Sequence, residues 1–127
     1  MSEAHGTVHW NELMTRDLEK TLDYYKTVCG WTIETVDMGE GDYHIARKGE
    51  EMTAGIMDIT GMPGMDDTPP HWLPYLAVAD VDHAVETTKQ KGGQVFRDCF
   101  DVPGVGRIAI VADPGGAAVG IMTPSEA

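Results

Sequence analysis

The chain has 127 residues and a mass of 13.8 kDa, which is the size of one ordinary domain. Nine Lys and Arg against 21 Asp and Glu give a formal net charge of −12, and such a surface repels phosphate backbones and anionic lipid headgroups. We therefore expect neither a nucleic-acid partner nor a membrane partner. The N-terminus lacks a basic segment followed by an apolar run, and the two cysteines form no CxxC pair, so we expect a cytoplasmic protein with reduced thiols.

The first half of the chain predicts the order β-α-β-β-β. Residues 7–15 are rich in β-favouring side chains, and Asp17 then supplies an N-cap for a helix that runs to about Cys29. One face of this helix is apolar, with the spacing shown by Leu18, Leu22, Tyr25 and Val28. Gly30 ends the helix. Three short β-prone runs follow, over residues 31–36, 43–47 and 53–59.

The second half predicts the same order after a connector. Residues 61–70 are dense in Pro and Gly and show no periodicity, which indicates a link between two packed modules. A strand over residues 73–79 and a helix over residues 81–91 come next. The last three strands are predicted over residues 94–100, 106–111 and 117–122.

The two halves are copies of one unit. Asp17 to Gly30 aligns with Asp80 to Gly93 at an offset of 63 residues (80 − 17), and Gly55-Ile-Met aligns with Gly120-Ile-Met at 65 (120 − 55). We therefore predict one domain made of module one, about residues 7–60, and module two, about residues 71–123. Because neither copy buries its apolar face alone, the two must share a core or a cavity.

Several local motifs accompany this repeat. They are the run from Glu12 to Leu18, Tyr24-Tyr25 with Gly30-Trp31 after them, the run from Tyr75 to Asp82, and Ala112-Asp-Pro-Gly-Gly. Together with the paired modules, they make nearly the whole chain resemble the vicinal oxygen chelate superfamily, and within it the small glyoxalase-like proteins. Glyoxalase I, extradiol dioxygenases and bleomycin resistance proteins belong to that superfamily. The resemblance implies an α+β fold whose two β-α-β-β-β modules form a curved mixed sheet around a small-molecule cavity, and it implies a homodimer.

The resemblance also locates the positions at which such enzymes hold a divalent ion. Their ligands are a His or Gln in the first strand of each module and a Glu in the last strand of each. The matching positions in this chain are Trp10, Leu73, Gly55 and Gly120. Indole, isobutyl and hydrogen side chains donate no electron pair to a metal, so we expect no metal and no other cofactor. A metal enzyme with displaced ligands stays open as an alternative.

Strand alternation then predicts the residues that line the cavity. If Trp10 faces inward, Glu12 and Met14 do so too. The repeat makes Tyr75 the counterpart of Glu12, so we predict that a carboxyl and a phenol face each other as an acid–base pair. Two alternatives for Glu12 stay open, an ion pair with an arginine such as Arg107 and a solvated place at the mouth. The further predicted ligand-binding residues, besides the four metal positions, are His44, Met57, Trp72, Arg107 and Met122.

For the two glycines and Trp72, the sequence also predicts a role in shaping the cavity. The glycines at positions 55 and 120 are expected to enlarge the cavity. Trp72 is expected to close its opening, with a core or dimer contact as an equal alternative.

Three classes of function remain. The favoured one is a metal-free binding protein for a flat apolar or aromatic small molecule, in the manner of the bleomycin resistance proteins. The second is a metal-free enzyme in which Glu12 is the general acid or base and Tyr75 a donor, acting on a carbonyl or epoxide. The third is the metal-dependent lyase or dioxygenase with displaced ligands.

Overall fold

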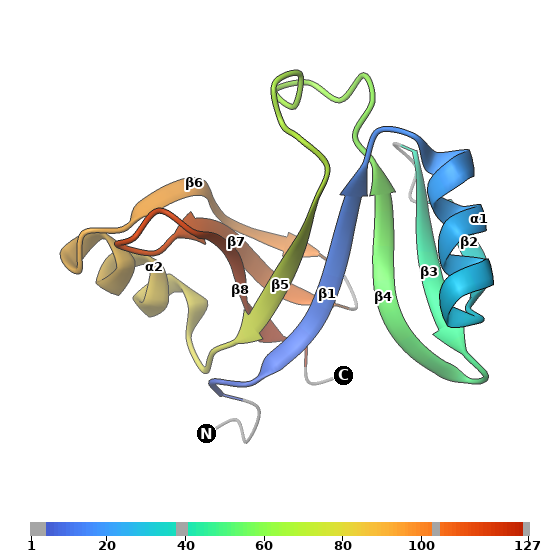
Figure 1. Ribbon diagram of the computed structural model, residues 1–127. Helices are drawn as coiled ribbons and strands as arrows, with labels where there is room; N and C mark the ends of the chain where they lie inside the picture. Colours follow the sequence, from blue (N-terminus) through green and yellow to red (C-terminus); the bar gives the residue numbers. More distant parts are fainter. Residues whose placement is uncertain (1–4, 38–40, 103–104, 126–127) are drawn as a thin grey trace. The chain divides into compact units, whose positions relative to one another are not determined.

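The computed structural model describes residues 5–37, 41–102 and 105–125. Within them the chain forms all of the predicted strands and helices, each ending within two residues of its predicted limits (Figure 1). In chain order they are β1 (Val8–Thr15), α1 (Leu18–Cys29), β2 (Thr32–Asp37), β3 (Asp42–Lys48), β4 (Glu51–Asp58), β5 (His71–Ala77), α2 (Val81–Gln90), β6 (Gln94–Val102), β7 (Gly106–Ala112) and β8 (Ala118–Pro124). The prediction of an α+β fold built from two β-α-β-β-β modules is confirmed. No helix in the described ranges is long and apolar enough to cross a membrane.

The chain divides into two compact units. The N-terminal unit is Trp10–Trp72, and the C-terminal unit is Leu73–Ala127 together with the residues up to His9. The start of the chain joins the C-terminal unit because the Gly6 amide donates to the Ala77 carbonyl at 2.7 Å, and the Ala77 amide donates to the Thr7 carbonyl at 2.9 Å. The connector groups with the N-terminal unit, in which the Arg16 guanidinium donates to the carbonyls of Met65 and Thr68.

In the N-terminal unit, four strands lie in the order β2-β3-β4-β1. β1 runs parallel to β4, and β3 runs antiparallel to both of its neighbours. The parallel pair follows from the crossover through α1, which lies against one face of this sheet (Figure 1). The core on that face consists of Leu13, Ala46, Ala54 and Ile56, packed against side chains that include Leu18 and Leu22 of the helix.

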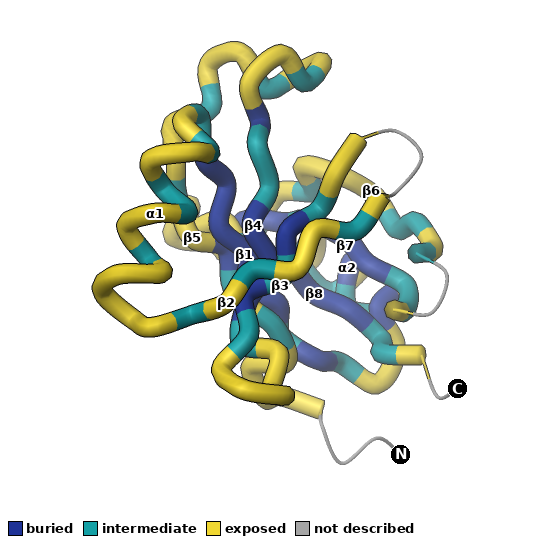
Figure 2. The backbone as a smooth tube through the Cα atoms, turned by 90° about the vertical axis from the view of Figure 1, so that its right-hand side faces the viewer, coloured by how far each residue is buried: buried dark blue, intermediate teal, exposed yellow. Residues whose placement is uncertain are grey.

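The C-terminal unit repeats this arrangement in the order β5-β8-β7-β6, with β5 parallel to β8. Val81 and Val85 of α2 are buried against Ala109, Val111 and Ile121 of the sheet. Figure 2 shows buried residues in dark blue along strands such as β1, β4, β7 and β8, whereas β2, β6 and α1 are coloured as exposed or intermediate over their whole length.

Matching caps begin the two helices. The Asp17 carboxylate accepts a hydrogen bond from the Lys20 amide at 3.2 Å, and the Asp80 carboxylate accepts one from the His83 amide at 3.1 Å. Gly30 ends α1 in a left-handed conformation, with φ of 71°, and its amide donates to the Lys26 carbonyl. Such cap residues mark helix ends in a sequence, so they support the helix limits predicted above.

Candidate functional site

The face of the N-terminal sheet opposite α1 carries the predicted lining residues of module one. Leu13 belongs to the core beneath the helix, so alternation along β1 turns Trp10, Glu12 and Met14 to the other face. In the parallel pairing with β4, Glu12 lies beside Gly55, and Met14 lies beside Met57. We call this face, with the residues just named, the Glu12 face.

Tyr43 of β3 joins this face and links two of its residues. The Trp10 indole nitrogen donates to the Tyr43 hydroxyl at 3.0 Å, and the Tyr43 hydroxyl donates to Oε2 of Glu12 at 2.7 Å. An indole N–H only donates, so the phenolic oxygen accepts from Trp10 and the phenolic proton is directed at Glu12. The carboxyl group of Glu12 is therefore held in one orientation while only 8% of the residue is exposed.

The environment keeps Tyr43 protonated. Burial, and then the charge of Glu12, raise the pKa of the Tyr43 phenol well above its usual value of 10.0, and the hydrogen bond from Trp10 opposes this only in part. Both leading causes penalise the phenolate, since an anion loses hydration on burial and is repelled by a neighbouring carboxylate. Tyr43 is consequently a permanent donor to Glu12 at physiological pH.

Gly55 is required by the position of Tyr43. A β-carbon added at residue 55 would lie 1.5 Å from the Tyr43 hydroxyl oxygen, 2.3 Å from Cζ of the same ring and 3.0 Å from the Trp10 indole nitrogen. The phenol therefore fills the space above this glycine. The prediction that Gly55 enlarges the cavity is wrong, because a side chain from the neighbouring strand occupies the space that residue 55 leaves.

The C-terminal unit also has a tyrosine ring over a glycine, but its tyrosine comes from β5, the first strand of the repeat. Tyr75 of β5 pairs with Gly120 of β8, and a β-carbon at residue 120 would lie 2.3 Å from Cδ2 of the Tyr75 ring. Leu73 shares the facing of Tyr75 along β5, and Met122 lies beside Ala77, so these predicted lining residues also share one face. Here too the expected enlargement is wrong, because the Tyr75 ring covers the glycine.

A metal ion does not fit the four positions that the family uses. The nitrogen of Trp10 is a donor already committed to Tyr43, and Leu73 has no electron pair to give. Tyrosine rings cover the two glycines, Gly55 and Gly120. In the described part of the chain there is also no cluster of three or more His, Cys, Asp or Glu side chains arranged to hold an ion.

His44 does not join the Glu12 face. It precedes Ile45 and Ala46 on β3 and shares the helix-side facing of Ala46, where it is 6% exposed and its Nδ1 hydrogen-bonds the Thr35 hydroxyl at 3.0 Å. Alternation along the strand sends Tyr43 and His44 to opposite faces. Strand alternation is visible in the sequence and could have identified Tyr43. Tyr43 and His44 are adjacent, so only one of them can lie on the same face as Glu12.

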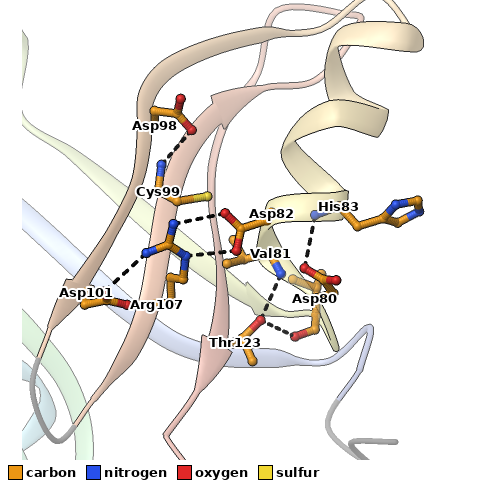
Figure 3. A network of polar contacts seen from close by, with 10 residues as sticks. Asp80, Val81, Asp82, His83, Asp98, Cys99, Asp101, Arg107 and Thr123 are labelled. Atoms are coloured by element: carbon orange, nitrogen blue, oxygen red, sulfur yellow. Dashed lines mark hydrogen bonds and ion pairs between the residues drawn. The ribbon is translucent and has the colours of Figure 1, made fainter.

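Arg107 also faces a helix. It alternates with Ile108 on β7 and so shares the side of Ala109, which packs against α2. Its guanidinium donates to the Asp82 carboxylate at 2.9 and 3.0 Å and to Asp101 at 3.2 Å (Figure 3). These hydrogen bonds lower the pKa of Asp82 and raise that of Arg107. The arginine is therefore a link between α2 and the sheet, which corrects its prediction as a lining residue.

Trp72 packs on the helix side of the N-terminal unit. Its indole nitrogen donates to the Tyr25 hydroxyl at 3.2 Å, and its ring meets those of Tyr25 and Trp31 edge to face, with centroids 5.7 and 6.5 Å apart. Of the two interpretations given to this residue, the structure supports a packing contact.

A family model described as the Glyoxalase/Bleomycin resistance protein/Dioxygenase superfamily matches residues 7–121. The chain belongs to this superfamily. The match covers both repeats, from the strand that carries Trp10 and Glu12 to the strand that carries Gly120, and it confirms the resemblance drawn from the sequence motifs.

Two relatives are similar along almost the whole chain. A Mycobacterium bovis protein named "Putative glyoxylase CFP32" is 35% identical over 121 residues, which are 94% of this chain and 45% of that protein. The Streptomyces peucetius protein named "Anthracycline biosynthesis protein DnrV" is 32% identical over 135 residues, covering 93% of this chain and 47% of that protein. The chain thus spans about half the length of the curated relatives it matches.

Solved structures share the fold at low sequence identity. Methylmalonyl-CoA epimerase from Mycobacterium tuberculosis matches with a TM-score of 0.65 at 14% identity, over 98% of this chain and 93% of that one. A hypothetical protein, BH1468 from Bacillus halodurans, matches with a TM-score of 0.71 at 10% identity, over 96% of each chain. At these identities the likeness concerns the fold alone.

Proposed function

We propose that this superfamily member binds a small, flat, apolar or aromatic molecule on the Glu12 face, without the usual metal, through a hydrogen bond to Glu12. The observation that carries the proposal is a carboxylate only 8% exposed, set on an otherwise apolar strand face and oriented by a phenol at 2.7 Å. Burying a carboxylate destabilises the folded state, and packing of the fold does not require a carboxylate at this position. A group kept there despite that cost is a candidate for function.

The chemistry of this face selects the ligand class. Trp10 offers an indole ring, and Met14 and Met57 offer polarisable thioethers, which suit a flat apolar body. A carboxylate only accepts hydrogen bonds, as Glu12 does from Tyr43, so the group that Glu12 would recognise is a donor, such as a hydroxyl or an amine. A net charge of −12 further favours a ligand that carries a positive charge.

The relatives support the same class of molecule. One of them is named for the biosynthesis of anthracyclines, which are fused-ring aromatic compounds. This chain covers less than half of that protein, so the name supports the ligand class and does not assign a reaction. We further propose a cytoplasmic location, where Cys29 and Cys99, which are both free thiols, stay reduced.

Catalysis by Glu12 is the second candidate. Because Tyr43 directs its proton at Glu12, the carboxylate is presented as a base, which suits removal of a proton from a carbon next to a carbonyl. The name of the mycobacterial relative, a glyoxylase, favours an enzyme. Tyr75 as the accompanying donor remains a prediction.

The test begins with native mass spectrometry of the purified chain, which detects any co-purified ligand or metal. The anthracycline amine daunorubicin is then titrated as a probe, with its own fluorescence as the readout. We expect Glu12→Gln to weaken binding by about 10- to 100-fold, since a hydrogen bond to a charged group is lost.

The matched control is Glu86→Gln, which removes the same charge from the exposed face of α2 and should leave binding unchanged. Equal affinity for Glu12→Gln and the wild type would contradict the proposal. If a substrate is found, a loss of turnover far larger than the loss of affinity in Glu12→Gln would establish the catalytic alternative.

A further inference from the structure

Two tryptophan rings stand nearly at right angles on the helix side of the N-terminal unit. The indoles of Trp31 and Trp72 have centroids 6.5 Å apart and an interplanar angle of 78°. Tyr25 stacks on one face of Trp31, with centroids 5.3 Å apart and an interplanar angle of 16°. Its hydroxyl accepts a hydrogen bond from the Trp72 indole nitrogen at 3.2 Å. Tyr25 therefore fixes both indoles, one by stacking and the other through its hydroxyl.

A hollow of about 330 Å³ lies beside these two indoles. Its lining residues all belong to the N-terminal unit and are Asn11, Trp31, Thr53, Ala54 and Trp72. Tyr25 covers one face of Trp31 and does not line the hollow, so the hollow adjoins the other face of that indole. Trp72 is 40% exposed, which gives a molecule in solution access to its ring. We call this space the Trp31–Trp72 hollow.

The polar groups of the hollow are neutral. The Asn11 side chain is exposed and has no hydrogen-bond partner among the described residues. Thr53 lies at a register shift between β3 and β4, and its hydroxyl donates to the Ala46 carbonyl at 3.1 Å. The Thr53 oxygen and the Asn11 amide oxygen are both acceptors. Two acceptors therefore border two aromatic rings, and no charged side chain lines the hollow.

The second module shows that the fold does not require this set of residues. At the repeat offsets of 63 and 65 residues, the positions of Asn11, Trp31 and Thr53 are taken by Pro74, Gln94 and Ala118. Gln94 is exposed, and the module that contains it forms the same strands and helix. An indole at position 31 is therefore not needed to build a β-α-β-β-β module, which makes it a candidate for binding.

We propose that the Trp31–Trp72 hollow binds a quaternary ammonium group, such as the trimethylammonium group of a small organic molecule. The face of an aromatic ring attracts a cation through its quadrupole, and the attraction is strongest for Trp. Two rings at nearly a right angle enclose a rounded group that touches both, whereas a flat ring stacks on only one of them. The formal net charge of −12 also draws cations toward the chain.

The lining favours a cation without N–H groups. A primary ammonium has three donors and loses hydration in the hollow, where no carboxylate lines the site to replace the lost water. A trimethylammonium group has no such donors, and its methyl groups contact the indoles directly. Asn11 and Thr53 are then available to a hydroxyl elsewhere on the ligand.

This site is separate from the Glu12 face. Asn11 alternates with Trp10 and Glu12 along β1, and Ala54 belongs to the core beneath α1. The hollow and the Glu12 face therefore lie on opposite sides of the sheet, so the inference does not depend on the function proposed above.

The experiment titrates the full chain with choline chloride at constant ionic strength and follows the indole N–H signals by NMR. We expect the signals of Trp31 and Trp72 to shift in a saturable way, with a dissociation constant on the order of 1 mM. The signal of Trp10, on the other side of the sheet, is the internal control and should not move.

Two compounds matched to choline test the kind of cation. One is the neutral alcohol in which a carbon atom replaces the nitrogen of choline, and the other is ethanolamine, a primary ammonium. Each should bind at least about tenfold more weakly than choline, because the first lacks the charge and the second needs acceptors for its N–H groups. Equal binding of choline and the neutral alcohol, or of choline and ethanolamine, would overturn the inference.

Trp31→Gln introduces the residue that the second module has at this place, so the variant should fold and bind choline at least about tenfold more weakly. Phe96→Gln is the matched control, since Phe96 is 59% exposed on β6, outside the hollow, and its loss should leave choline binding unchanged. Circular dichroism checks the folding of both variants. Unmoved indole signals in the wild type, or wild-type affinity in Trp31→Gln, would contradict the proposal. If Trp31→Gln does not fold, the comparison of choline with the neutral alcohol on the wild type decides.

Discussion

A tyrosine from a neighbouring strand defines the candidate site at the scale of single residues. Tyr43 accepts a hydrogen bond from Trp10 and donates one to Glu12, and its ring has room to do so because residue 55 has no side chain. Gly55 and Tyr43 thus act together to orient the buried carboxylate of Glu12. In the second repeat, the Tyr75 ring covers Gly120 in the same way.

Gly55→Ala tests this dependence. The added methyl group collides with the Tyr43 phenol, so we expect the free energy of unfolding to fall by about 1–3 kcal/mol, measured by urea denaturation. Gly115→Ala is the control, because its β-carbon would meet only Asp113 Oδ1 at 3.4 Å, and its effect should be within about 0.5 kcal/mol. Equal stabilities for the two variants would show that Tyr43 does not occupy the space above residue 55.

Tyr43→Phe tests the hydrogen-bonded chain and its response to pH. At neutral pH the variant leaves Glu12 and Trp10 without the phenol and should lose about 1–3 kcal/mol of unfolding free energy. The folded-state pKa of Tyr43 is raised above the unfolded value of 10.0, so its contribution is complete below pH 10 and is lost as the pH rises beyond it.

Above pH 10 the wild type should therefore lose about 1.4 kcal/mol per pH unit through this group, and the Phe variant should not. Denaturation curves at a series of pH values check the prediction, and the difference between the two proteins isolates Tyr43 from the other titrating groups. A constant difference from pH 8 to pH 11 would contradict the burial of this phenol.

At the scale of elements, the two helices differ in how they are held. α1 and α2 have the same type of N-cap and the same place in the repeat, but only α2 is anchored by buried valines, Val81 and Val85. Arg107 adds a further link between α2 and the sheet through Asp82. α1 rests on half-buried side chains that include Leu18 and Leu22.

Amide hydrogen exchange should register this difference. We expect the amides of α1 to exchange at least about tenfold faster than those of α2, because α1 has no buried residue and α2 has two. α2 serves as the internal control, since it has the same type of N-cap and the same place in the repeat. Equal protection of both helices would show that the buried valines do not make α2 the more stable helix.

At the scale of the whole molecule, charge governs association. Each chain carries a formal net charge of −12, so two copies repel each other. Salt screens this repulsion, so the dissociation constant of the homodimer that the family resemblance predicts should fall several-fold between about 20 and 200 mM NaCl. Sedimentation equilibrium at several salt concentrations measures this. A dissociation constant that rises with salt would indicate an interface built on ion pairs instead.

The sequence by itself determined the elements, the duplication and the superfamily. The signals that located the elements are local, namely cap residues, Gly and Pro positions and apolar spacing. Because the chain is duplicated, they occur in both modules, and every predicted element lies within two residues of its observed limits. Strand alternation also placed Trp10, Glu12 and Met14 on one face, since side-chain direction along a strand follows from position alone.

Only the tertiary structure decided which side chains fill that face. The sequence indicated Gly55 as empty space, but the ring above it comes from Tyr43, on the adjacent antiparallel strand. His44 and Arg107 look suitable for a binding site in sequence, but in the structure both lie on the helix side of their sheets, where His44 is hydrogen-bonded to Thr35 and Arg107 to Asp82. Side-chain neighbours across a sheet depend on pairing between distant segments, and no local pattern specifies the register with that accuracy.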